Sequence, residues 1–302
     1  MKFYNLLFFI FLTTLLPAQQ IPDTSYHPKI TAPMYPPEGG PFVFIDAAHD
    51  NFHTRTGRYQ SFTSLLESDG YRLADNEEKF TDQSLQGKVL LVIANARPAE
   101  NAHPGIAPTA SAFTDAEISA VEKWVKQGGS LLLIADHMPF AGAAANLAAA
   151  FGFTFYDGFA LYRPGKELID FSISEGSLTD CVITQGRNAG EQVTQVRSFT
   201  GQGFKIPAAA QSILNLSASQ TIYLTDTTWV FNDRIRHFPA TGLSQGAIMD
   251  YGAGRIACFG EAAMFSAQLA GPNHFKAGMN SPEAAQNFQL LLNLIHWLDY
   301  RL

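Results

Sequence analysis

The stretch "FTDAEISAVEKWVKQGGSLLLIADH", residues 113–137, places a helix pattern directly before a strand pattern. Thr114 is a good N-cap, and Glu117 follows three residues later, as in a capping box. Apolar residues recur at helical spacing until Gly128 and Gly129, which favour a helix end. Residues 130–136 are almost continuously apolar, which is typical of a strand covered on both faces. We therefore expect a helix-covered, parallel β-structure here.

The same alternation extends in both directions along the chain. Strands are predicted at residues 42–45, 71–73 and 88–96 ("KVLLVIANA"), helices at 59–68, 141–153 and 281–298, and a hairpin at 247–251 and 255–259. Such alternation predicts an α/β fold, flavodoxin-like, with a mostly parallel central sheet and helices on both faces. Between about residues 156 and 219, short strand patterns lie among polar turns. We interpret them as an inserted antiparallel β-rich segment.

Composition excludes several classes of protein. The 302 residues are 46% hydrophobic and 16% charged, which suits a folded domain with a large core and argues against disorder. The formal net charge is −7 and no basic cluster is present, so nucleic acid is not expected as a partner. Two cysteines, Cys181 and Cys258, cannot form a disulfide-rich scaffold. Spacing alone does not establish whether they pair, and we favour Cys258 as a small buried residue.

The first residues, "MKFYNLLFFIFLTTLLPAQQ", have the form of a secretory signal. A lysine precedes an apolar stretch too short to span a bilayer comfortably, and a small residue, Ala18, follows. We expect residues 1–19 to be a signal peptide, with an uncleaved membrane anchor as the alternative. The mature protein would be exported, periplasmic or secreted if bacterial, with no stable membrane insertion. Residues 20–41 are proline-rich and form an extended leader, and residues 42–302 form a single domain.

Polar side chains follow four of the predicted strands at the points where the strands end. In open α/β sheets, ligands bind beyond the carboxyl ends of the strands, so these side chains predict a crevice at that edge. The catalytic candidates are His49, Asp46, Asp136, His137 and Glu261; the ligand-binding candidates are Asn51, His53, Asn95 and Arg58. Taken singly, each could equally be an ordinary loop residue or a helix cap.

These residue types allow two kinds of chemistry. His49 could act as a general base oriented by Asp46. The set of Asp46, His49, Asp136 and Glu261 has the imidazole and carboxylate ligands that a divalent metal requires, although no H-E-x-x-H pattern occurs. We expect no resident cofactor, with a divalent metal as the alternative. No G-x-S-x-G nucleophile elbow is present. Ser266 is the one hydroxyl that we consider as a nucleophile, and the alternative is that it is an ordinary surface serine.

Four motifs resemble an uncharacterised branch of the class I glutamine amidotransferase-like superfamily. They are "FIDAAHDNFHTRTGRYQSFTSLLESDGY", the stretch quoted first, "GRIACFGEAAMF" and "NFQLLLNLIHWL". The resemblance covers most of the chain from residue 42 to residue 298. The resemblance implies a flavodoxin-like sheet. Amidotransferases of the superfamily carry an elbow cysteine, whereas this chain has Asp136 and His137 near that position. Glutaminase activity is therefore not expected, and relatives of this branch suggest sugar- or envelope-associated binding.

Three functions follow as hypotheses. The first is an exported, non-catalytic protein that binds a small or carbohydrate-like ligand, such as a glycan, at the strand ends. The second is an exported hydrolase, metal-assisted or based on His49 and carboxylates, at the same crevice. The third is a structural envelope component that acts through protein contacts. The absence of a nucleophile favours the first.

Overall fold

The computed structural model describes residues 20–98 and 105–302, so the predicted signal peptide lies outside the described residues. The helices, in chain order, are α1 (Gln60–Ser68), α2 (Asp82–Leu85), α3 (Asp115–Lys126), α4 (Phe140–Ala150), α5 (Val182–Gln185) and α6 (Asn287–Leu298), with 3-10 turns η1 (Ala189–Glu191), η2 (Ala263–Phe265) and η3 (Pro282–Ala284). Among these described residues, no helix has both the length and the apolar character needed to cross a membrane.

A nine-stranded sheet forms the centre of the molecule. Its strands are β2 (Phe42–Asp46), β3 (Arg72–Asn76), β4 (Leu90–Ala94), β5 (Ser130–Ile134), β6 (Thr154–Phe155), β10 (Phe204–Lys205), β11 (Gln211–Asn215), β14 (Ser244–Tyr251) and β15 (Gly254–Phe259). The parallel part has the order β3-β2-β4-β5-β15, and β14 continues it antiparallel. The predicted mostly parallel sheet is confirmed. The chain reverses its direction of winding between β2 and β4, which is where ligand crevices open in such sheets.

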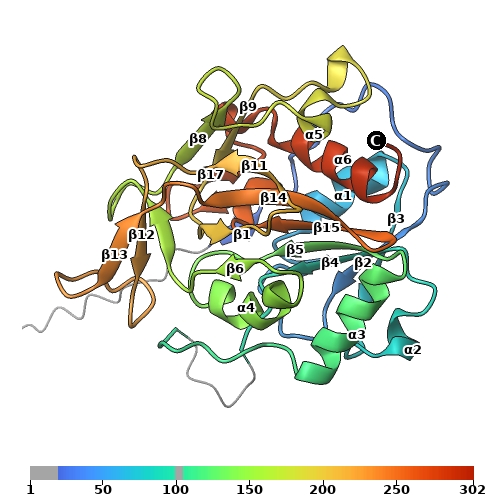
Figure 1. The fold of residues 1–302 in the computed structure, drawn as a ribbon. Helices are drawn as coiled ribbons and strands as arrows, with labels where there is room; N and C mark the ends of the chain where they lie inside the picture. Colours follow the sequence, from blue (N-terminus) through green and yellow to red (C-terminus); the bar gives the residue numbers. More distant parts are fainter. Residues whose placement is uncertain (1–19, 99–104) are drawn as a thin grey trace, which may run out of the picture.

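Helices cover both faces of this sheet (Figure 1). On one face, Leu90, Val92 and Ala94 of β4 pack in a core with residues of α1 and α6. On the other, Leu91 and Ile93 pack in a core with residues of α3 and α4. Because successive side chains of a strand point to opposite faces, a strand between two helical layers must be apolar throughout. This explains the uninterrupted apolar patterns of β4 and β5.

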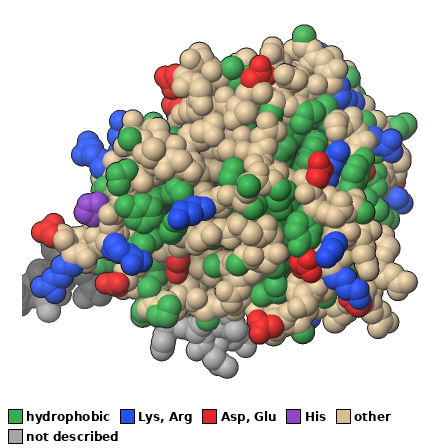
Figure 2. All heavy atoms as spheres, in the orientation of Figure 1, with side chains coloured by type: hydrophobic (Ala, Val, Ile, Leu, Met, Phe, Trp, Pro, Cys, Tyr) green, Lys and Arg blue, Asp and Glu red, His purple; other side chains and the backbone are tan. Residues whose placement is uncertain are grey.

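An antiparallel β-rich part adjoins the central sheet, at the left of Figure 1. It contains β7 (Phe159–Leu161), β8 (Ile169–Ser172), β9 (Gln195–Ser198), β12 (Thr221–Leu224) and β13 (Arg236–Pro239), in sheets ordered β13-β12-β7 and β8-β9. Figure 2 shows hydrophobic side chains gathered on that side of the molecule, with Lys and Arg side chains among them. The small sheets thus add surface to the α/β core.

The leader is bonded to the body of the protein. Strand β1 (Gln20–Pro22) pairs with β16 (Ala267–Ala270), which in turn pairs with β17 (Phe275–Gly278). Further along, the Met34 N–H donates to the Asp69 carboxylate at 2.7 Å, and the Tyr35 hydroxyl donates to Asp299.

The predicted start of the C-terminal helix is wrong. The pattern of residues 281–298 predicts a C-terminal helix that begins at Ser281. Instead, Pro282–Ala284 forms a 3-10 turn and α6 begins at Asn287. The Ser281 hydroxyl donates to the Glu283 carboxylate at 2.7 Å and caps no helical N–H.

Candidate functional site

The carboxyl ends of the parallel strands lie at one edge of the sheet. In the register of the sheet, Ala94 at the end of β4 pairs with Ile134 at the end of β5, and Ile134 pairs with Phe259 at the end of β15. The chain therefore delivers Asn95, Asp136 and Glu261 to the same edge, where β2 delivers Asp46. All four side chains are buried, with at most 8% of the residue exposed. The candidates lie under the surface of this edge.

His49 is held between two carboxylates. Its Nδ1 lies 2.9 Å from an Asp46 oxygen, and its Nε2 lies 2.8 Å from the Glu117 Oε1. The rings of Phe80 and Phe113 flank the imidazole, with centroid distances of 4.6 and 4.7 Å. We call Asp46, His49 and Glu117 the His49 network. Carboxylates accept hydrogen bonds, so the ring makes both contacts only when both nitrogens carry a proton.

Glu117 has two roles: it caps α3, and it binds His49. One oxygen, Oε2, completes the predicted capping box of α3 by accepting from the Thr114 N–H at 3.0 Å and from its hydroxyl at 2.8 Å. The other oxygen reaches His49. Burial raises the pKa of Glu117, but the hydrogen bonds from Thr114 and His49 outweigh it and hold the pKa at about 2. The capping box signalled only the first role, so Glu117 was absent from the predicted site.

A second group of buried residues surrounds Asn95, and we call His53, Tyr59, Asn95, Asp136 and Glu261 the strand-end cluster. The Asn95 amide faces both ways: its Oδ1 accepts from the Asp136 N–H at 2.9 Å, and its Nδ2 lies 3.1 Å from His53 Nδ1. Asn95 has a φ of 51°, in the left-handed region that residues other than glycine rarely occupy. Such strain concentrates where the surrounding structure fixes a functional geometry.

His53 retains an unused hydrogen-bonding group. When Nδ1 accepts from the Asn95 amide, the ring proton resides on Nε2. That nitrogen is buried and has no hydrogen-bond partner in the described part of the chain. Burial lowers the pKa of His53 to about 3, and the nearby Arg58 contributes to the shift, so the ring is neutral at physiological pH.

Asp136 and Glu261 form an interacting pair of buried acids. Glu261 accepts N–H hydrogen bonds from Ala263 at 2.7 Å and Met264 at 2.8 Å, and Asp136 accepts one from His137 at 2.8 Å. Burial raises the pKa of both carboxyl groups, and repulsion by Asp136 raises that of Glu261 further. Burial and these two acids also raise the pKa of Tyr59, which sequence reasoning missed because an isolated tyrosine before a helix gives no signal.

Arg58 and His137 lie nearer the surface, at the rim of the strand-end cluster. The Arg58 guanidinium lies 3.7 Å from the centroid of the Phe52 ring, and its Nε is buried without a hydrogen-bond partner among the described residues. Burial and the neighbouring Arg97 lower the pKa of Arg58. The His137 ring stacks on Phe159 at a centroid distance of 4.5 Å.

Several predicted candidates already have partners within the protein. Asn51 donates to the Ala94 carbonyl and accepts from the His49 N–H, so its amide holds the loop to β4. The Ser266 hydroxyl is buried and donates to the Ala263 carbonyl. Both cysteines are buried and free, and burial raises the pKa of the Cys258 thiol.

The structure does not gather the proposed metal ligands. His49 and Asp46 belong to the His49 network, whereas Asp136 and Glu261 belong to the strand-end cluster. Residues 20–98 and 105–302 contain no group of three or more His, Cys, Asp or Glu that could hold a metal ion. Residues 47–58 form a loop, so the i, i+3, i+7 spacing of Asp46, His49 and His53 does not place them on one helical face.

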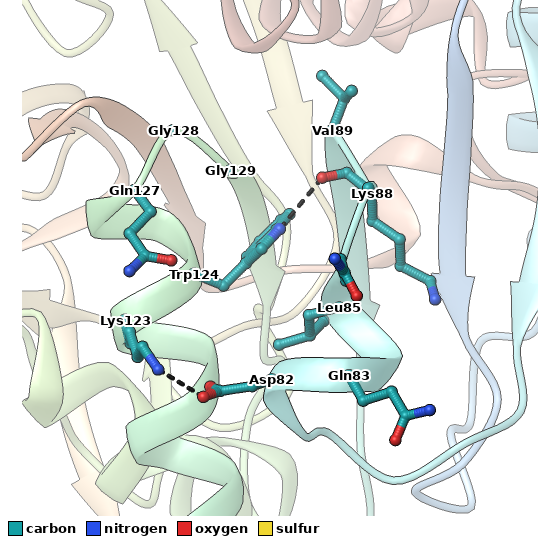
Figure 3. Close-up of a pocket in the computed structure, with 12 residues that line it drawn as sticks. Asp82, Gln83, Leu85, Lys88, Val89, Lys123, Trp124, Gln127, Gly128 and Gly129 are labelled. Atoms are coloured by element: carbon teal, nitrogen blue, oxygen red, sulfur yellow. Dashed lines mark hydrogen bonds and ion pairs between the residues drawn. The ribbon is translucent and has the colours of Figure 1, made fainter.

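A hollow of about 710 Å³ lies at the opposite, amino-terminal edge of β4 and β5 (Figure 3). Two polar contacts lie in it: Lys123 pairs with Asp82, and the Trp124 indole N–H donates to the Lys88 carbonyl at 3.1 Å. None of its lining residues has a buried side-chain polar atom without a partner, whereas His53 and Arg58 at the carboxyl edge do.

The chain matches no protein-family model and no curated protein. Among solved structures, the N-terminal domain of mmIFT52 is similar with a TM-score of 0.57 at 16% identity, over 85% of this chain and 97% of that one. A cytoplasmic protein from Salmonella typhimurium follows with a TM-score of 0.49 at 11% identity, over 85% and 98%. A ThuA-like protein from Bacteroides uniformis has a TM-score of 0.43 at 12% identity, over 90% and 94%. The similarity to the first shows a shared fold.

Proposed function

We propose that the protein binds a small, carbohydrate-like ligand at the carboxyl edge of the sheet and does not catalyse a reaction there. One observation carries the proposal. His53 and Arg58 are neighbours, and His53 Nε2 and Arg58 Nε are both buried without a hydrogen-bond partner within the described chain. Buried donors are normally satisfied, because an unmade hydrogen bond costs roughly 1–3 kcal/mol. A ligand rich in hydroxyl or carboxylate oxygens would satisfy both.

The His49 network supports a non-catalytic reading. A general base needs a free nitrogen within reach of the substrate proton. Both nitrogens of His49 are occupied by carboxylates, and the residue is only 3% exposed. We infer that this histidine holds the loop after β2 to α3.

A fold assignment accompanies this proposal. We infer a flavodoxin-like fold and membership of the class I glutamine amidotransferase-like superfamily without the elbow cysteine. The strand order supports the flavodoxin-like fold. Numbered in chain order, the parallel strands lie along the sheet as second, first, third, fourth, fifth.

Thermal unfolding with a panel of mono- and disaccharides tests the binding function. A ligand at a hundred times its dissociation constant should stabilise the wild type by about 2.7 kcal/mol. Arg58→Gln should remove most of this effect. Arg72→Gln is the matched control, because Arg72 lies over a phenylalanine ring at the other edge, 4.1 Å from the centroid of Phe42. Equal ligand shifts in both variants would contradict the proposed site.

A hydrolase is the second candidate, and the Asp136–Glu261 pair favours it. Two interacting carboxyl groups with raised pKa values can divide the roles of acid and base. Wild-type protein should then cleave some member of an ester and glycoside panel, and Glu261→Gln and Asp136→Asn should each lower kcat at least a hundredfold. A wild type that is inactive across the panel would count against the hydrolase.

We also propose export, on the basis of residues 1–19. Expression in a bacterium followed by cell fractionation should recover the protein outside the cytoplasm, and sequencing of its first residues should place the cleavage at about Ala18 or Gln19. A full-length chain in the cytoplasm would contradict export.

A further inference from the structure

We propose that a hollow beside α4 binds a sugar acid, meaning a pyranose that carries a carboxylate. We call it the α4 hollow. It is separate from the strand-end cluster, so this proposal does not depend on the proposed function. Four segments line its volume of about 630 Å³: residues 107–111, α4, residues 155–157, and the facing ends of β12 and β13. This volume is in the range of small-molecule sites.

Asp157 provides a carboxylate in the α4 hollow. It is half-buried, and its Oδ1 accepts from the Gly142 N–H of α4 at 3.1 Å. A Cβ at Gly142 would lie 2.5 Å from the Asp157 carboxyl, so only glycine leaves room for this approach. Asp157 forms no ion pair with any described residue. Such a carboxylate can accept hydrogen bonds from the hydroxyl groups of a sugar.

Two arginines provide positive charge to the same hollow. Arg234 and Arg236 line it, and both are exposed. Neither forms an ion pair with a carboxylate of the described chain. Guanidinium groups bind carboxylates through paired, charge-assisted hydrogen bonds. Asp226 also lines the hollow and is exposed, so the hollow holds two carboxylates as well as two arginines. Ser111 and Asn146 offer hydrogen bonds, and Phe155, Leu224 and Ile235 form apolar walls.

This combination selects one chemical class of ligand. The arginines suit an anionic group, the Asp157 and Asp226 carboxylates suit donors such as hydroxyls, and the apolar walls suit the C–H face of a ring. A simple anion such as acetate would leave Asp157 and the walls unused, and a neutral sugar would leave the arginines unused. A sugar acid uses all three.

Isothermal titration with glucuronate, galacturonate and N-acetylneuraminate tests the site, with glucose and acetate as partial ligands. At least one sugar acid should bind the wild type tenfold or more tightly than either partial ligand. The Arg234→Gln, Arg236→Gln double variant should weaken that binding at least tenfold, and Asp157→Asn at least threefold. Circular dichroism and thermal unfolding verify that the variants are folded.

Arg58→Gln in the full-length protein separates this site from the strand-end cluster. It should leave sugar-acid binding within twofold of the wild type. Three results would overturn the proposal: no binding of any of the three sugar acids, acetate binding as tightly as they do, or loss of binding in Arg58→Gln with retention in the double arginine variant. The last result would instead locate the ligand at the strand ends.

Discussion

Single residues at the carboxyl edge show how burial decides what a side chain can do. His49 and His53 lie four positions apart on one loop. His49 has a carboxylate on each nitrogen, whereas His53 has one amide partner and one unused nitrogen. The first arrangement fixes structure, and the second leaves a donor for a ligand.

Replacing His49 tests its structural role. His49→Ala leaves Asp46 and Glu117 buried without their shared partner, so we expect a loss of roughly 3–5 kcal/mol in the free energy of unfolding. Urea denaturation measures it. Lys123→Ala is the control, because its pair with Asp82 is exposed and should contribute less than about 1 kcal/mol. Similar losses in the two variants would refute a structural His49 network.

The pH dependence of stability provides a second test at this scale. The pKa of His53 falls from 6.5 to about 3 on folding. Between these values the unfolded chain binds a proton that the folded chain does not, so the free energy of unfolding increases with pH. This stabilisation is complete above pH 6.5 and is lost as the pH falls toward 3. The urea midpoint of the wild type should therefore drop more steeply from pH 7 to pH 4 than that of His53→Leu. Parallel curves would show that His53 titrates normally.

The sequence predicted these side chains at one edge because strand direction fixes where strand ends lie. It could not predict their partners. Glu117 is distant from His49 in sequence, and its capping motif fully accounts for its presence. Likewise, Asp136 and His137 are neighbours in sequence, yet Asp136 is buried toward Glu261 while His137 stacks on Phe159. Pairing depends on tertiary contacts that carry no local pattern.

At the scale of elements, α3 and β15 are fitted to each other through a glycine. Gly254 begins β15 beneath the last turn of α3. A Cβ at this position would lie 2.1 Å from the Val125 carbonyl oxygen and 2.2 Å from that of Gly129. The sequence "GAG" predicted the hairpin turn correctly. It did not indicate that Gly254 also leaves room for the end of α3 to pack against β15.

Gly254→Ala should therefore destabilise the protein. Backbone atoms cannot rotate away as a side chain can, so we expect a cost of about 2–3 kcal/mol from overpacking. Thermal unfolding measures the change. In the control Gly190→Ala, the new Cβ meets only the Asn188 side chain at 3.1 Å, and the cost should stay below about 1 kcal/mol. A neutral Gly254→Ala would show that α3 and β15 separate easily.

At the scale of the whole molecule, the leader connects distant parts of the chain. Asp69 is fully buried, accepts from the Met34 N–H, and contacts His296 Nε2 at 2.6 Å. One carboxylate thus joins the leader, the end of α1 and the C-terminal helix. Proline content predicted an extended leader but not its attachment, since extended segments carry no record of what they contact.

Asp69→Ala should loosen this junction. It leaves the Met34 N–H and His296 without their partner, so we expect a loss of about 3–5 kcal/mol and faster cleavage by trypsin after the exposed Lys29. Limited proteolysis followed by mass spectrometry detects the released segment. Asp180→Ala, which removes an exposed carboxylate, is the control. Unchanged cleavage after Lys29 would show that other contacts hold the leader.

The pairing of β1 with β16 has a consequence for biosynthesis. Gln20 lies opposite Ala270, so the first strand finds its neighbour only when nearly the entire polypeptide has left the ribosome. Joining such remote segments slows folding. In a nascent chain, β1 would thus stay unpaired during most of translation and would pair with β16 only when synthesis is almost complete.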